Sequence, residues 1–255
     1  MTEDRSDAGA AYRITGVALT DTTIVLTLAD GHTVTEPLQG HVRLEKATAE
    51  ERERWQPTEH GHGVNWPQLR EPTADGMVNV WGILQDRLYA EALNQLQDAD
   101  WDIDAISPHD RDLVALWRAE ADVNNGGFLQ FLGNWGVDNH RTAVAALDTI
   151  GATATADILR AMFTLVAPYL TAGIESFSDI YALLTDPDTD RLEELDESFW
   201  KYPDPLSRLV VEHHHGHRAA SGSADVVGRE SNTRAVREVE PSELPTASMR
   251  GAAGP

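Results

Sequence analysis

The sequence has 255 residues, of which 42 are acidic and 20 basic, so its formal net charge is −22. This charge excludes a surface that attracts nucleic acid or anionic membrane, and the lack of cysteine excludes disulfides, cysteine zinc sites and thiol nucleophiles. The length favours two modest domains over one. The N-terminal residues are charged and no apolar run approaches the length of a membrane span, so we expect a cytoplasmic protein.

The first part of the chain has the pattern of a small β-rich module. Residues 1–11 are small and polar, which predicts a disordered tail. Residues 12–71 begin with three runs of β-branched residues, and Asp30-Gly31 before the third run is typical of a hairpin turn. A capping-box pattern at Thr48-Ala49-Glu50-Glu51 predicts a short helix, and residues 61–67 are expected to form a loop or an edge strand.

This module resembles a small bacterial domain family of unknown function. The resemblance rests on Arg43-Leu44, on the helix from Ala49 to Trp55, and on the Gly63 to Pro67 segment with its Trp-Pro close. Members of that family occur fused to DNA-binding domains or beside toxin genes, which implies a regulatory setting.

The period of apolar residues becomes helical after a turn-rich linker at residues 72–76. From Met77, apolar residues recur on one face as far as Leu96, which predicts a helix. An acidic connector follows, and Ser107-Pro108 has the pattern of a helix start. We expect that next helix to end at Gly126 and Gly127, because glycine can adopt the left-handed conformation.

Further short apolar faces predict a helical domain over residues 77–215. Asp138-Asn139 can cap a helix that Gly151 is expected to close. The later faces centre on Ile180, Leu192 and Phe199, with Phe177 among them. Residues 216–255 carry mixed charge and few aromatics, which predicts a disordered tail. The predicted fold class is therefore α+β overall, with a β-rich module, an all-α domain and disordered ends.

The phrase around the two glycines has two interpretations. It could form a polar pocket, or it could end a helix while the asparagine amides make buried hydrogen bonds, and we favour the structural interpretation. The residues of this motif are Asn124, Asn125, Gly126, Gly127 and Phe128.

This phrase, with Gln130 and Phe131 after it, resembles the bacterial DNA-mimic protein family. The helical domain of that family carries a Glu, an Asn-Gly-Gly-Phe and a following Gln-aromatic pair. The resemblance runs from about Asp110 to about His213. It implies a non-enzymatic, dimeric, acidic protein that occupies the nucleic-acid-binding surface of a basic partner such as a transcription factor.

Acidic residues are concentrated in the same region. Residues 81–215 hold 24 acids and 8 bases, a net charge of −16. The densest run is interrupted by one base, Arg191, and both extended and helical spacing would place its carboxylates at intervals close to those of duplex phosphates. The candidate partner-binding residues are Asp186, Asp188, Asp190, Glu193, Glu194, Asp196 and Glu197. The alternative interpretation is that the charge only keeps the protein in solution.

Other chemistry is not indicated. Consecutive histidines at 213–215 cannot all ligate one metal from a regular element, so we expect no metal site there. The sequence has no nucleophile elbow, phosphate-binding loop or zinc-protease motif, so we expect no cofactor and no catalytic residue. Two other functions remain open: an immunity or antitoxin-like protein that binds a toxin, and a hydrolase. Direct binding to nucleic acid or membrane is not expected.

Overall fold

The computed structural model of the protein describes residues 9–171 and 179–221, and the chain divides into two compact units. The first comprises Met1–Glu91 and Ser207–His215, and the second comprises Ala92–Leu206 and Gly216–Pro255. The division confirms the predicted α+β class, because all the strands of the described residues lie in the first unit and the second unit is helical. None of the described helices is long and apolar enough to span a membrane.

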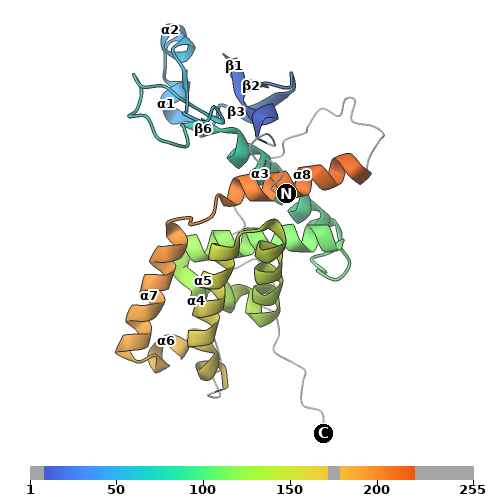
Figure 1. Ribbon diagram of the computed structural model, residues 1–255, viewed down its shortest axis with the longest axis vertical. Coiled ribbons are helices and arrows are strands. Elements are labelled where there is room, and N and C mark those ends of the chain that lie inside the picture. The colour runs from blue at the N-terminus through green and yellow to red at the C-terminus, as the bar shows by residue number, and fades with distance from the viewer. Residues whose placement is uncertain (1–8, 172–178, 222–255) are drawn as a thin grey trace, which may run out of the picture. The chain divides into compact units, whose positions relative to one another are not determined.

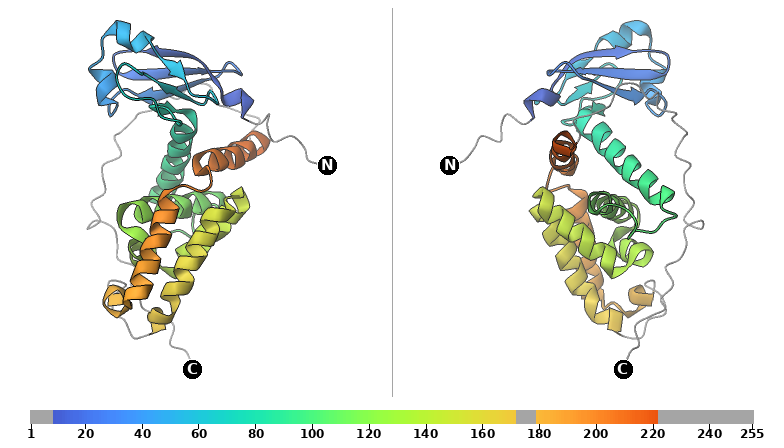
Figure 2. Two further views of the ribbon diagram at one scale, coloured as in Figure 1. Left: turned by 60° about the vertical axis from the view of Figure 1, so that its left-hand side comes forward. Right: turned by 90° about the vertical axis from the view of Figure 1, so that its right-hand side faces the viewer.

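The first unit contains an antiparallel sheet of three strands, β1 (Ile14–Leu19), β2 (Thr23–Leu28) and β3 (Thr33–Pro37), in the order β1-β2-β3 (Figure 2). These are the three strands that the sequence predicts. Alternate residues of β2 point inward, and Ile24 and Leu26 are fully buried. A short 3-10 helix, η1 (Ala10–Tyr12), precedes β1, so the predicted disordered tail is wrong for residues 9–11.

A second sheet of three short strands completes this unit: β4 (Gln56–Pro57), β5 (Gly63–Asn65) and β6 (Val78–Asn79). β5 is its buried central strand, so the expectation of a loop or an edge strand is wrong. Two short helices, α1 (Val42–Glu45) and α2 (Ala49–Glu53), lie between the sheets in sequence. Thr48 forms the predicted capping box with Glu51, and the buried Trp66 indole donates a hydrogen bond to the carbonyl of Arg52.

Residues 72–76 are not a free linker. The Asn65 side chain donates to the carbonyl of Thr73 at 2.9 Å and accepts from its N–H at 3.2 Å. The N–H of Met77 bonds to Val64, and β6 then pairs with β5. The division between the units therefore falls after Glu91 and not at the predicted linker, because these hydrogen bonds tie the segment into the first unit.

The remaining elements are helical: α3 (Val80–Asp98), α4 (Pro108–Ile150), α5 (Thr153–Val166), η2 (Ala167–Thr171), α6 (Asp179–Leu183), α7 (Asp186–Trp200) and α8 (Leu206–Ser221) (Figure 1). The apolar face predicted from Met77 is buried along α3, although the helix itself begins at Val80. Helix α8 continues through Gly216 to Ser221, beyond residue 216, at which the sequence analysis placed the start of a disordered tail. The predictions for Phe177 and for residues 1–8 and 222–255 lie outside the described residues.

Within the second unit, α4, α5 and α7 pack against one another around apolar side chains (Figure 1). Phe128, Phe131, Leu159, Met162 and Phe199 are each at most 2% exposed. This shared core holds the glycine motif of α4 beside the acidic helix α7, and it therefore sets the geometry of the candidate site.

Candidate interaction site

The glycine motif interrupts α4 instead of ending it. The backbone is non-helical at Gly126 (φ −151°, ψ 18°) and Gly127 (φ 81°, ψ 179°), and the helix resumes at Phe128 without an intervening loop. A second interruption with nearly the same geometry lies at Gly136 (φ 75°, ψ 179°), two residues before the Asp138-Asn139 pair at which the sequence predicts a helix start. Figure 2 shows the resulting changes of direction along α4. The predicted break is confirmed, but Gly127 adopts an extended conformation of positive φ and not the left-handed helical one.

A carboxylate from α7 fills the break. The N–H of Phe128, which opens the next helical segment, donates to Oδ1 of Asp196 at 2.9 Å. A Cβ atom on Gly127 would lie 2.7 Å from Oδ2 of Asp196. Glycine is thus needed at residue 127 for two reasons: the positive φ, and the close approach of this carboxylate.

Asp196 therefore does not belong to an exposed acidic face, contrary to the sequence-based expectation. Its side chain is buried, with 9% exposed, and burial raises its pKa to about 6 despite the hydrogen bond from Phe128. The sequence does contain the signal, since Asp196 lies four residues after Leu192 and three before Phe199, on the apolar face of α7.

The residues at the end of α7 form hydrogen bonds with the part of α4 that directly precedes the break. The Trp200 indole donates to the carbonyl of Val123 at 2.9 Å. The Asn124 amide donates to the Tyr202 hydroxyl at 2.6 Å, and that hydroxyl donates to Glu120 at 3.2 Å. Asn124 and Asn125 are both exposed, so the expected buried amide bonds are wrong, although Asn124 does join the two helices.

A polar network that the sequence analysis did not identify bridges the two sides of the break. The carboxylate of Asp122 accepts hydrogen bonds from the side chains of Gln130, Asn134 and Trp135. The guanidinium of Arg118 lies 3.9 Å from the centre of the Trp135 ring. Burial lowers the pKa of Arg118 to about 10, a value at which it still carries its charge at neutral pH. Asp122 is thus held by internal donors and is not a free surface charge.

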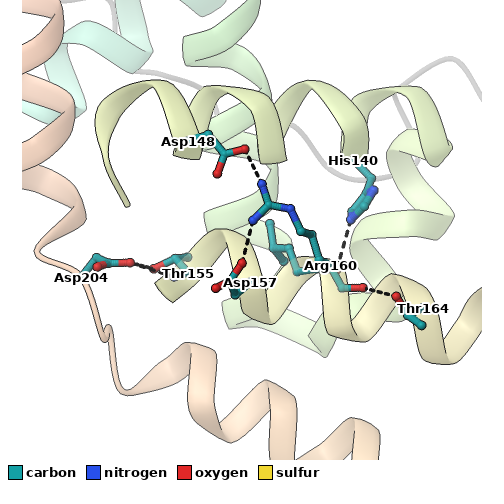
Figure 3. Close-up of polar contacts among 8 residues, drawn as sticks. His140, Asp148, Thr155, Asp157, Arg160, Thr164 and Asp204 are labelled. Atoms are coloured by element: carbon teal, nitrogen blue, oxygen red, sulfur yellow. Dashed lines mark hydrogen bonds and ion pairs between the residues drawn. The ribbon is translucent and has the colours of Figure 1, made fainter. Parts of the chain in front are cut away.

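Three further acids of this unit also have internal partners, as Figure 3 shows. Asp204, in the connection after α7, accepts hydrogen bonds from the N–H of Thr155 at 2.7 Å and from its hydroxyl at 2.9 Å. Arg160 forms ion pairs with Asp148 and Asp157. These acids therefore interact partly with groups of their own fold, and their negative charge is less available to a partner.

The exposed carboxylates of α7 lie on a regular helix. Of the two spacings that the sequence allows, extended and helical, the helical one applies, because α7 begins at Asp186 with Thr185 as its N-cap. Asp188 bonds to the hydroxyls of Thr185 and Tyr169, and the Tyr169 bond is the main cause that lowers the pKa of Asp188. The acids of α7 that are exposed are Asp186, Asp190, Glu193, Glu194 and Glu197. We call these five residues the acidic stripe.

Helical geometry brings the acidic stripe together on one side of α7. Asp186, Asp190, Glu193 and Glu197 follow one another at intervals of four, three and four residues, and Glu194 lies four residues after Asp190 and three before Glu197. Helical side chains at these spacings are neighbours. Arg191, the single base in α7, pairs with Glu194 at 2.7 Å. Within the described residues, no group of three or more His, Cys, Asp or Glu side chains is placed to hold a metal ion.

The fold and this surface define a two-part protein, a small β-rich domain followed by an acidic helical domain. The family model described as DMP19-like protein matches residues 104–217, and the one described as protein of unknown function (DUF2442) matches residues 14–74. The chain thus carries a DMP19-like domain preceded by a DUF2442 domain, which confirms both resemblances. No curated protein and no solved structure matches the chain.

Proposed function

We propose that this protein is a non-enzymatic binding protein whose acidic stripe occupies the nucleic-acid-binding surface of a basic partner, such as a transcription factor. The observation that carries the proposal is the row of five exposed carboxylates on one side of α7, with a single base among them. Neighbouring helical carboxylates lie about 5–6 Å apart, and the phosphates of one DNA strand follow one another at a similar interval. The match of this region to the DMP19-like family supports a role in protein–protein interaction.

The clustered negative charge should increase the association rate of basic partners and select them over nucleic acid. Clustered charges of one sign steer an oppositely charged partner and repel nucleic acid, and screening by salt weakens both effects. Each exposed ion pair contributes only about 0.2–1 kcal/mol, so we expect affinity to accumulate over the stripe without one dominant carboxylate.

The cellular setting is part of the same proposal. We infer that the protein acts in the cytoplasm, where nucleic-acid-binding partners are found, and that it forms a homodimer. The lack of cysteine suits a reducing compartment. Sedimentation of the full chain at micromolar concentration tests the dimer, and a monomer at all concentrations would contradict it.

The test is a competition assay with two variants of equal charge. Partners are first captured from the native lysate at low salt and released at high salt. A released DNA-binding partner is then offered labelled DNA together with the protein. The stripe variant replaces Asp186, Asp190, Glu193, Glu194 and Glu197 by their amides. The control variant replaces five exposed acids outside α7, namely Asp98, Asp100, Asp102, Asp104 and Asp138.

We expect the wild type and the control variant to displace DNA at low salt, and the stripe variant to displace it at least ten-fold less effectively. The stripe variant omits Asp188 and Asp196, because both have structural hydrogen bonds. Equal displacement by all three proteins would contradict the acidic stripe as the binding surface. Capture of a toxin in place of a nucleic-acid-binding protein would favour the immunity function.

A further inference from the structure

Two aromatic side chains at the end of α7 are exposed yet held in place. Trp200 is 48% exposed and Tyr202 is 42% exposed. The indole N–H of Trp200 and the hydroxyl of Tyr202 are both hydrogen-bonded to α4, at Val123 and Asn124. The polar ends of these rings are therefore engaged within the unit, while each residue keeps more than 40% of its surface exposed.

The acidic stripe runs toward these rings. Trp200 follows Glu197 by three residues and Glu193 by seven, so the three side chains lie on the same side of the helix. The Tyr202 hydroxyl also contacts Glu120 at 3.2 Å. Lys201 is exposed between the two aromatic residues in the sequence, and the carboxylates around it leave the region negative.

We infer that the Trp200–Tyr202 pair receives an arginine side chain of the basic partner, an inference that rests on the proposed function and names the anchor of its binding surface. A guanidinium can stack on an aromatic face and form a paired hydrogen bond with a carboxylate at the same time. Glu197 supplies that carboxylate one helical turn from Trp200. An ammonium group is a compact, strongly hydrated charge and fits this combination less well.

Preorganisation is the reason that the pair suits an anchor. Buried aromatic anchors dominate many interfaces, and side chains fixed before binding lose little further conformational entropy. Hydrogen bonds to α4 fix Trp200 and Tyr202 in the free protein. The acidic stripe then provides attraction at longer range, and the aromatic pair provides selectivity between arginine and lysine.

The experiment measures binding of labelled deca-arginine and deca-lysine peptides to the full chain at several salt concentrations. Trp200→Phe and Trp200→Leu both lose the indole hydrogen bond to Val123, but only the phenylalanine variant keeps an aromatic face. Comparing these two variants therefore separates the ring surface from the hydrogen bond. Trp101→Leu is the control, because Trp101 is also an exposed tryptophan between acids, at 41% exposure, and belongs to the connection between α3 and α4.

We expect the wild type to prefer deca-arginine. The leucine variant at residue 200 should lose about two- to five-fold in affinity for deca-arginine, the range expected for an exposed cation–π contact, and little for deca-lysine. The phenylalanine variant should retain most of the preference. Trp101→Leu should leave it unchanged.

Three outcomes would overturn the inference: equal binding of the two peptides by the wild type, equal losses in the leucine and phenylalanine variants, or an equal loss in Trp101→Leu. A leucine variant that turns a dimer into a monomer would assign the pair to self-association instead. The stripe variant separates this test from the proposed function. If neutralising the stripe weakens binding of both peptides while Trp200→Leu does not, the aromatic anchor fails and the acidic surface stands. If the stripe variant binds both peptides like wild type, the proposed surface itself fails.

Discussion

Gly127 and Gly136 have the same backbone conformation in different surroundings. A Cβ atom on Gly127 would meet Asp196, whereas one on Gly136 would have no atom within 4 Å outside its chain neighbours. We predict that Gly136→Ala costs about 1–3 kcal/mol through its positive φ alone, and that Gly127→Ala costs more. Urea unfolding followed by circular dichroism measures both. Equal costs would show that Asp196 moves away freely. In a protein that also carries Asp196→Ala, the cost of Gly127→Ala should fall to that of Gly136→Ala.

Asp196 gives the helical unit a specific dependence on pH. Its folded-state pKa of about 6 lies above the value of about 3.9 for an unfolded aspartate. The folded state therefore binds this proton more tightly, so the stabilisation is fully present below about pH 4 and is lost as pH rises through about 6. We predict that the stability of wild type relative to Asp196→Asn falls by on the order of 2 kcal/mol across that window.

The measurement is urea unfolding of both proteins from pH 4 to pH 8. The asparagine side chain cannot ionise, and its oxygen can still accept the hydrogen bond from Phe128. His140 titrates in the opposite sense, because burial lowers its pKa and stability is lost as pH falls below about 6.5. Since His140 is present in both proteins, its contribution cancels in the difference. Parallel pH curves would contradict a buried, titrating Asp196.

At the scale of the elements, α5 depends on a cap from outside its own sequence. Its N-cap residue, Ala152, has no side-chain hydrogen bond, and Asp204 accepts from Thr155 in its place. We predict that Asp204→Ala costs about 0.5–2 kcal/mol and speeds hydrogen exchange at the Thr155 amide. Asp157→Ala, which removes an exposed acid of the same helix, should cost less than about 1 kcal/mol. Similar costs would mean that Asp204 contributes only charge.

These contacts show which element ends a sequence can predict. Thr48, Ser107 and Gly151 act on backbone groups within a few residues, and all three behave as their local patterns indicate. Gly136 stands between Trp135 and Val137, without the adjacent second glycine that marks the break at Gly127. Asp204 acts on a residue 49 positions away, and no local pattern reports such a distance. A helix cap made by nearby residues can be predicted from the sequence, whereas a cap supplied by a distant segment can be identified only in the folded structure.

For the whole molecule, the sequence predicted the two classes of structure but not their boundary. Composition and period distinguish the β-rich part from the helical part, and both parts match a family model. The turn residues at 72–76 predicted a linker, yet Asn65 fastens that segment to the first unit. Similarly, the acidic run of α7 was predicted as one face, although the side chain of Asp196 turns inward and Asp188 is held by neighbouring hydroxyls.

The net charge of −22 should also destabilise the folded chain through self-repulsion. We predict that added sodium chloride raises the thermal unfolding temperature of wild type, and that the stripe variant and its equal-charge control both show a smaller rise. For stability the amount of charge matters, whereas for partner binding its position on α7 matters. A differential scanning measurement from low to high salt tests this. A salt response that differs strongly between the two variants would contradict it.

The carboxylate in the break of α4 also bears on the order in which the chain can fold. The segment that begins at Phe128 and the helix that begins at Thr153 leave the ribosome before Asp196 and Asp204 do. Because a domain folds as a unit, neither helix can have the hydrogen bond at its leading N–H group until that later segment has been synthesised. Their N-termini are closed only when the segment from residue 185 to 204 docks. Helix α7 thus completes α4, although α7 is synthesised later. The glycine motif of α4 can therefore reach its final geometry only after α7 has been made.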